Sequence, residues 1–522
     1  MALTDTAPET DAPTTSPSEA ETSSSPARPS GLETLLGTTD HRVIGRIFVV
    51  TALLAIITDL GFAALVYLDI AGDGVLESRL IARLAVNNGL GLFVGTLALF
   101  VGIGIIVVPR QVGAAAISFP RAAAAAAWTW VLSVVVWGVA LVFGGSYGGF
   151  HTDMVRLGNV AVGATLLAIM VGAVCIATTV LSSRPMGMGL GQVPFFAFSM
   201  LVASTVWVLT LPSAIAHITL GQITQANPAT MLSVTFDQGL SWLLRQPSLY
   251  VIAIPVLGFA IDAVAHLSGT NPRARGLLQT SIGAFGFLSF GAWAQGDFAS
   301  HTIVWVGYAA LIGLPVLGVL AAVLATLKAG GRLKIASPIG FAIFTLLVLL
   351  LGCLVGGFLA LDEIGKGQLV GFEPSFTSHG QFLFVFGAAL IGALGACFYW
   401  GRLVFGSPPP DTAGKGLAPL ALVAAVLFAA PVALIGLLTT EGDTTRIFAG
   451  IAAAGAALFA LVVIGALGAG VVAMRTASRG DELLPDPWGD AGTLEWLDEL
   501  TVVSFDSPYP LRAGGSDEKG DS

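Results

Sequence analysis

The chain alternates between long apolar stretches and short polar connections, and the apolar stretches set the fold. A helix that crosses a bilayer needs roughly 20 mostly apolar residues. The stretches are continuous and do not alternate residue by residue, so they predict helices and exclude a transmembrane barrel. Twelve such spans are expected, at residues 44–68, 84–108, 122–145, 157–182, 194–220, 238–264, 276–297, 302–327, 338–360, 377–400, 417–438 and 447–473. The sequence therefore predicts an all-α, polytopic membrane protein built as a twelve-helix bundle.

Polar segments flank this bundle on both sides. Residues 1–36 are rich in Ser, Thr, Pro and Glu and predict a disordered cytoplasmic tail. No apolar core precedes a cleavage site there, so we do not expect a signal peptide. Residues 475–522 form a second polar tail, also expected in the cytoplasm, and residues 37–474 form one bundle. Because the connections are short, successive helices are expected to be antiparallel neighbours.

Basic residues predict the orientation of the bundle in the membrane. With the N-terminus inside, 17 of the 23 Lys and Arg residues fall on the cytoplasmic side and five on the outer side. One further residue, Arg245, falls inside a predicted span. This bias predicts a multi-pass protein of a prokaryotic plasma membrane with a cytoplasmic N-terminus.

Composition agrees with a membrane protein and excludes several other classes. Charged residues make up 11% of the chain, against roughly 25% in soluble domains. The net charge of −9 gives no reason to expect nucleic-acid binding. Cys175, Cys353 and Cys397 all fall within apolar spans, and no Cys-x-x-Cys or Cys/His cluster is present. Neither a disulfide framework nor a zinc site is expected.

Five segments, in order along the chain, carry a resemblance to a known family. They are Thr-Thr-Asp-His-Arg-Val-Ile-Gly (38–45), Pro-Arg-Gln-Val-Gly-Ala-Ala-Ala-Ile-Ser-Phe-Pro-Arg (109–121), Trp-Leu-Leu-Arg-Gln-Pro-Ser-Leu-Tyr-Val-Ile-Ala-Ile-Pro (242–255), Trp-Ala-Gln-Gly-Asp-Phe (293–298) and Asp-Pro-Trp-Gly-Asp-Ala-Gly-Thr-Leu-Glu-Trp (486–496). Together they resemble subunit I of cytochrome c oxidase, the catalytic subunit of the haem–copper oxidases. The resemblance implies twelve spans with the N-terminus inside, two haems and one copper held by six histidines, and proton-pumping electron transport.

The residues at the family's ligand positions do not match this chemistry. Asn88, Gly380 and Phe382 stand at the three haem positions. Gln246, Gln295 and Gly296 stand at the three copper positions. Imidazole serves the family because a neutral nitrogen donor suits both iron and copper. Of the chain's six histidines only His379 falls near a ligand position, one residue away. The sequence therefore predicts no haem and no copper.

The residues that the family uses to conduct protons are replaced as well. Ala116 stands at the position of an aspartate, Ser248 at that of a glutamate and Val319 at that of a lysine. Tyr250 keeps the position of the family's tyrosine. Ionisable residues inside a membrane are costly and usually functional, so their joint absence argues against redox-driven pumping.

Polar residues near the vacated positions form a candidate cluster. Its members are Asp59, Asn87, Asn88, Arg245, Gln246, Tyr250, Gln295, Asp297 and His379. Charges at bilayer depth are stabilised by pairing, so we expect Arg245 to pair with Asp297. Asp59 is expected at a similar depth to Asn87 and Asn88, and its carboxyl is expected either to accept hydrogen bonds from these amides or to be protonated in its apolar setting. The cluster either fills and hydrates a vacated cavity, or forms an altered binding or ion-translocation site.

Three functions remain open from the sequence. The first is a degenerate oxidase-like subunit or scaffold that associates with other membrane subunits of a respiratory complex. The second is a working oxidoreductase with unusual ligands, with the cytochrome c oxidase activity, haem binding and electron transport that the resemblance implies. The third is an ion or small-molecule transporter that uses the vacated site. The missing ligands favour the first.

Overall fold

The structure is a computed structural model of the chain. It describes residues 37–72, 74, 78–146, 149–226, 240–245, 247–272, 274–290, 307, 309–330, 335–364, 374–479, 486–489 and 493–496. Contacts divide the chain into two units, residues 1–38 and 39–522, and the second unit holds the long apolar helices.

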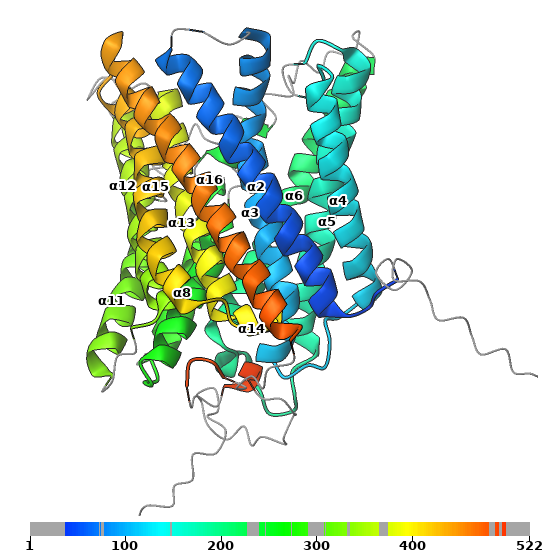
Figure 1. The fold of residues 1–522 in the computed structure, drawn as a ribbon, viewed down its shortest axis with the longest axis vertical. Helices are drawn as coiled ribbons and strands as arrows, with labels where there is room; N and C mark the ends of the chain where they lie inside the picture. The colour runs from blue at the N-terminus through cyan, green and yellow to red at the C-terminus, as the bar shows by residue number, and fades with distance from the viewer. Residues whose placement is uncertain are drawn as a thin grey trace, which may run out of the picture. The chain divides into compact units, whose positions relative to one another are not determined.

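The described residues of this unit form helices and no strand (Figure 1). The α-helices are α2 (His41–Ala71), α3 (Ser78–Gln111), α4 (Pro120–Val142), α5 (Thr152–Ser182), α6 (Phe195–Ala226), α8 (Ile254–Leu267), α9 (Arg275–Ser289), α11 (Gly313–Ala329), α12 (Ser337–Ile364), α13 (Pro374–Tyr399), α14 (Gly401–Phe405), α15 (Asp411–Leu437) and α16 (Asp443–Ala477). Short 3₁₀ helices are η1 (Leu190–Gln192), η2 (Ser241–Leu244), η3 (Ser248–Ala253) and η6 (Leu494–Trp496).

Eleven of the described helical segments are long and apolar enough to cross a membrane. They correspond to eleven of the twelve predicted spans, so the predicted polytopic helical bundle is confirmed. The described part of the remaining span, 276–297, is the shorter helix α9, and residues 291–297 lie outside the described residues.

The sixth span differs from its prediction. The sequence predicts one helix over residues 238–264, but the membrane-spanning segment is Ser248–Leu267 and the preceding described residues form the separate turn η2. Arg245 follows η2 with extended backbone (φ −108°, ψ 157°). Pro247 has no N–H to continue a helix ladder, and hydropathy alone does not register that loss.

Two helices lie at the centre of the bundle. The most apolar segments of α3 and α13 are buried along their whole length, and the two helices contact each other. Helix α2 packs on α3, α12 and α15 pack on α13, and α16 returns beside α2 (Figure 1). Glycine allows the closest approach: a Cβ at Gly102 would lie 2.7 Å from Phe48 Cβ and 2.9 Å from the Gly45 carbonyl oxygen. Small residues at such contacts are typical of membrane helices.

Candidate functional site

Asn88 and Phe382, which occupy two of the predicted haem positions, lie where α3 contacts α13. A Cβ at Gly89 would lie 2.8 Å from Leu244 Cδ1 and 4.0 Å from both His379 Cε1 and Phe382 Cε1. Side chains from α13 and from η2 thus press directly against α3 beside Asn88.

The side chains at this contact are engaged with one another. Asn88 Nδ2 donates a hydrogen bond to the backbone carbonyl of Asp59 at 2.5 Å. Phe382 is fully buried, and its ring centroid lies 6.1 Å from that of His379 and 6.3 Å from that of Phe386. An amide and a phenyl ring supply none of the axial ligands that hold haem iron in proteins, which are His, Cys, Met and Tyr.

Gly380, the third haem position, faces a different neighbour. A Cβ there would lie 2.5 Å from the backbone nitrogen of Ala433 in α15. Positions two apart on a helix point in nearly opposite directions, so Gly380 and Phe382 face opposite sides of α13. Gly380 therefore allows α15 to approach α13 and leaves no room for a side chain.

The predicted polar cluster separates into smaller groups. Asp59, Asn87 and Asn88 lie close together between α2 and α3, but Asn88 donates to the backbone carbonyl of Asp59, and among the described contacts neither amide donates to its carboxyl. The expected pairing of Arg245 with Asp297 stays a prediction, because Asp297 lies outside the described residues, as do Gln246, Gln295 and Gly296. Arg245 itself is exposed and not within a helix, so its predicted place inside a span was wrong.

Tyr250 pairs with a residue that the sequence did not single out. Gln381 Nε2 donates a hydrogen bond to Tyr250 Oη at 2.8 Å, and both side chains are buried. The Tyr250 hydroxyl donates in turn to the carbonyl of Gly352 at 3.4 Å. Gln381 stands between Gly380 and Phe382 on α13, so a third direction of this helix faces η3. A glutamine inside an apolar span was a signal that could have identified it.

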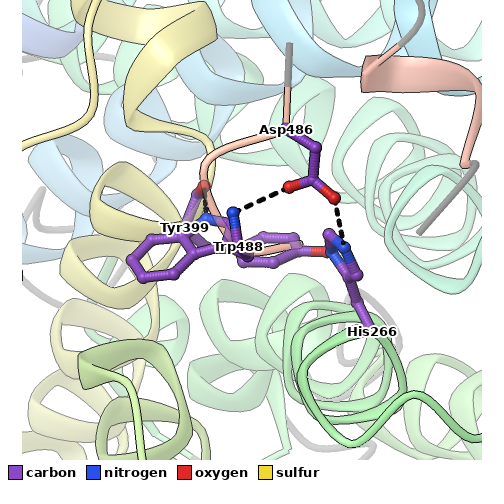
Figure 2. A network of polar contacts seen from close by, with 4 residues as sticks. All are labelled: His266, Tyr399, Asp486 and Trp488. Carbon is purple, nitrogen blue, oxygen red and sulfur yellow. Dashed lines mark hydrogen bonds and ion pairs between the residues drawn. The ribbon is translucent and has the colours of Figure 1, made fainter. Parts of the chain in front are cut away.

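A polar network closes the end of the bundle where α3 and α13 finish (Figure 2). His266 Nδ1 is hydrogen bonded to Tyr399 Oη at 2.5 Å, and His266 Nε2 to Asp486 Oδ2 at 2.9 Å. Trp488 donates its backbone N–H to Asp486 Oδ1 and its indole N–H to the carbonyl of Tyr399, at 2.9 and 2.8 Å. We call His266, Tyr399, Asp486 and Trp488 the C-terminal network.

Beside this network, Asp262 binds the start of α6. Its carboxylate accepts hydrogen bonds from the backbone N–H groups of Phe195 and Phe196 at 3.1 and 2.8 Å, and from Gln111 Nε2 at 3.2 Å. These backbone groups are donors that a helix N-terminus leaves unpaired. Asp262 therefore joins α8 to α6 and α3.

Glu495 is a deeply buried acid of the C-terminal segment. It is 3% exposed and lines a cavity of about 50 Å³ together with Asp262 and His266. Burial raises the pKa of the Glu495 carboxyl, because the charged form loses its hydration. Among the described residues, no group of three or more His, Cys, Asp or Glu is arranged to hold a metal ion.

Comparison with known proteins decides the family. The family model described as cytochrome c and quinol oxidase polypeptide I matches residues 43–479. The chain belongs to this family. The resemblance seen in the five sequence segments is thereby confirmed.

Three relatives show how distant the chain is from individual family members. It is 24% identical over 498 residues to the haem–copper oxidase subunit I+III of Aeropyrum pernix, which covers 88% of this chain and 59% of that protein. It is 26% identical over 270 residues to cytochrome c oxidase subunit 1 of Debaryomyces hansenii, covering 48% of each chain. Against cytochrome c oxidase subunit 1 of Candida albicans it is 23% identical over 414 residues, covering 71% of this chain and 75% of that protein. The chain thus spans about half of the length of the first two relatives.

Proposed function

We propose that this chain is a non-redox member of the subunit I family, which keeps the membrane bundle but binds neither haem nor copper. One observation supports the proposal: the residues at the three predicted haem positions offer no haem ligand, and each is engaged with neighbouring protein groups. Asn88 is bonded to α2, Phe382 packs in an aromatic row, and Gly380 lies against the backbone of α15. The residues present do not fit haem, because an amide, a glycine and a phenyl ring offer no axial ligand to iron.

The lone nearby imidazole does not change this proposal. His379 lies beside Gly89, Phe382 and Tyr67, with a centroid separation of 6.5 Å from the tyrosine ring. One imidazole cannot ligate two haems and a copper. We propose a structural role for the bundle, in which it assembles with other membrane subunits of a respiratory complex.

A visible spectrum tests the absence of haem. The full chain is purified from its native membranes in mild detergent, and a reduced-minus-oxidised difference spectrum is recorded together with metal analysis for iron and copper. We expect far less than one haem per chain. Stoichiometric haem bands or stoichiometric copper would overturn the proposal. Cytochromes that remain in the same solubilised membranes serve as the positive control for haem retention.

Co-purification tests the scaffold role. A tagged full-length chain, captured from membranes solubilised under the same conditions, is expected to bring down other membrane proteins in fixed ratio. Capture of the chain alone, after chemical crosslinking in intact membranes, would contradict a scaffold role. The spectrum tests the loss of haem and the capture tests the scaffold role, so either result can contradict one claim and leave the other standing.

We also propose that the chain lies in a prokaryotic plasma membrane with its N-terminus inside. The bundle presents exposed residues at both ends for a test, namely Met186 after α5 and Asp443 at the start of α16. The described cysteines, Cys175, Cys353 and Cys397, are buried. On intact cells, a membrane-impermeant maleimide should label Asp443→Cys at once and Met186→Cys only after lysis. The reverse pattern would contradict the orientation.

A further inference from the structure

A cavity lies between α2, α3 and α4, on the side of α3 that carries Asn87 and Gly91. Its volume is about 230 Å³, and its walls are mostly apolar. Thr58 of α2 and Gly138 of α4 line it and are exposed. Both residues lie inside membrane-spanning helices, so the opening faces the bilayer. A molecule dissolved in the membrane could enter sideways.

One carboxyl group faces this cavity. Asp59 lines it from α2 and packs over Gly91 of α3, where a Cβ would overlap the carboxyl group. Among the described residues, the Asp59 carboxyl has no hydrogen-bond or ion-pair partner; only its backbone carbonyl accepts, from Asn88. An ionisable group inside a membrane is costly without a partner and usually has a function.

The other polar side chains of the cavity already have acceptors within the protein. Trp130 Nε1 donates to Thr51 Oγ1 at 2.8 Å, and Trp137 Nε1 donates to Ser146 Oγ at 2.8 Å. Thr58 Oγ1 donates to the carbonyl of Leu54 at 3.0 Å.

The Asn87 side chain is also hydrogen bonded within the protein. Its Nδ2 donates to the carbonyl of Arg83 at 2.7 Å, and its Oδ1 accepts from Ser146 Oγ at 2.6 Å. The cavity therefore offers an acceptor in Asp59 and aromatic surface from Trp130 and Trp137. A ligand that donates hydrogen bonds to the Asp59 carboxyl and carries a positive charge would match this lining.

We propose that this cavity binds a small organic ammonium ion, a protonated amine with an apolar body. The ammonium group would pair with the Asp59 carboxylate through charge-assisted hydrogen bonds. The apolar body would lie against Trp130 and Trp137, since indole faces attract cations and bury apolar surface. Ligands that offer only acceptors, such as carbonyl compounds and anions, would have no donor with which to pair the Asp59 carboxylate. The site is independent of the proposed loss of haem and copper.

The experiment compares an amine with its neutral counterpart on the full chain in lipid nanodiscs. The probes are 2-phenylethylamine and 2-phenylethanol, which differ at the group expected to meet Asp59. Binding is measured at pH 7 by titration calorimetry, with empty nanodiscs subtracted for partition into lipid. We expect the amine to bind at least tenfold more tightly than the alcohol. Equal affinity for the two probes, or no amine binding above that of empty nanodiscs, would overturn the proposal.

Two carboxylate variants test whether amine binding depends on Asp59. Asp59→Asn should lower amine affinity at least tenfold and leave the weak binding of the alcohol unchanged. Asp69→Asn, a carboxylate on the same helix but outside the cavity lining, should bind the amine as the natural chain does. Undiminished amine binding in Asp59→Asn would overturn the proposal.

A second variant blocks the opening without touching the carboxyl group. A Cβ at Gly138 meets no atom within 4 Å, so Gly138→Leu fits the fold and projects into the mouth of the cavity. We expect at least a tenfold loss of amine binding with an unchanged melting temperature. Full amine binding in Gly138→Leu would contradict entry through this opening, and with it the proposed site.

Discussion

The contact between α3 and α13 and the end of the bundle closed by the C-terminal network bury different kinds of side chain. Where α3 meets α13, Phe382 packs beside Phe386 and lies close to Gly89 of α3. At the closed end, His266, Tyr399 and Asp486 satisfy one another through hydrogen bonds. Buried polar groups are costly unless paired, and a closed network removes that cost.

This difference shows which part of the structure the family resemblance describes. Asp486 and Trp488 belong to a segment that carries the resemblance, and both hold the C-terminal segment onto the bundle. Their match to the family therefore indicates how the bundle closes. It says nothing about the positions at Asn88 and Phe382, where metal chemistry would reside, because fold and function are specified by different residues.

The largest expected effect comes from breaking the C-terminal network. His266→Leu removes the side-chain partner of Asp486, whose side chain is only 12% exposed, and leaves this nearly buried carboxylate with the backbone N–H of Trp488. Removing one partner of a buried pair costs about 3 kcal/mol. Thermal unfolding of the purified chain in detergent measures the loss.

The matched control for that variant is His151→Leu. His151 is exposed before α5, and its side chain makes no capping hydrogen bond there. Its replacement should change stability by less than about 0.5 kcal/mol. If the two leucine variants unfold at the same temperature, the network contributes nothing to stability.

The next effect tests the close packing of α13 against α15. Gly380→Ala places a Cβ 2.5 Å from the backbone of Ala433, which must move away. Overpacking of this kind costs about 2 kcal/mol. Gly416→Ala, in α15, meets no atom within 4 Å and should be neutral or slightly stabilising. Equal melting temperatures for both variants would show that α13 and α15 are not closely packed at this point.

A smaller effect is expected at the pairing of Gln381 with Tyr250. Gln381→Leu removes a buried hydrogen-bond donor and should cost about 1 kcal/mol. The double variant with Tyr250→Phe should cost less than the sum of the two single variants, because each single change already removes the hydrogen bond that the two side chains share. Additive losses in the unfolding free energy would mean that the two side chains do not interact.

The smallest effect concerns pH. Burial raises the pKa of Glu495 in the folded chain, so the folded state holds this proton at pH values where the unfolded state has lost it. Stability should therefore fall as pH rises from the ordinary pKa of a glutamate through the raised value. Glu495→Gln should flatten this dependence and should be more stable than the natural chain at high pH. The melting temperatures of both chains are measured across the pH range. Parallel curves would contradict a contribution of Glu495 to the pH dependence of stability.

Most of the fold could be predicted from hydropathy, since each long apolar stretch must become a helix in a membrane. The start of the sixth span could not, because hydropathy does not show that Pro247 lacks the backbone N–H that would continue a helix through it. The prediction thus placed Arg245 inside a helix that begins after it.

The candidate site was less predictable, because its contacts join distant parts of the chain. Asp59 and Asn88 were selected because both are polar within apolar spans. Gln381 and His266 were not, and their partners lie 131 and 220 residues away in sequence. Spacing along one helix gives no information about which face meets another helix.

The return of α16 to the side of α2 has a consequence for how the protein is made. Arg46, near the start of α2, donates a hydrogen bond to the carbonyl of Val404, 358 residues later. During synthesis α2 enters the membrane long before α14 and α16 exist, and its face toward them stays without protein neighbours until then. Contacts of such long sequence separation form slowly. Assembly of the bundle therefore ends with packing against its first helix. A chain that stops before α16 would leave one face of α2 without its neighbouring helix.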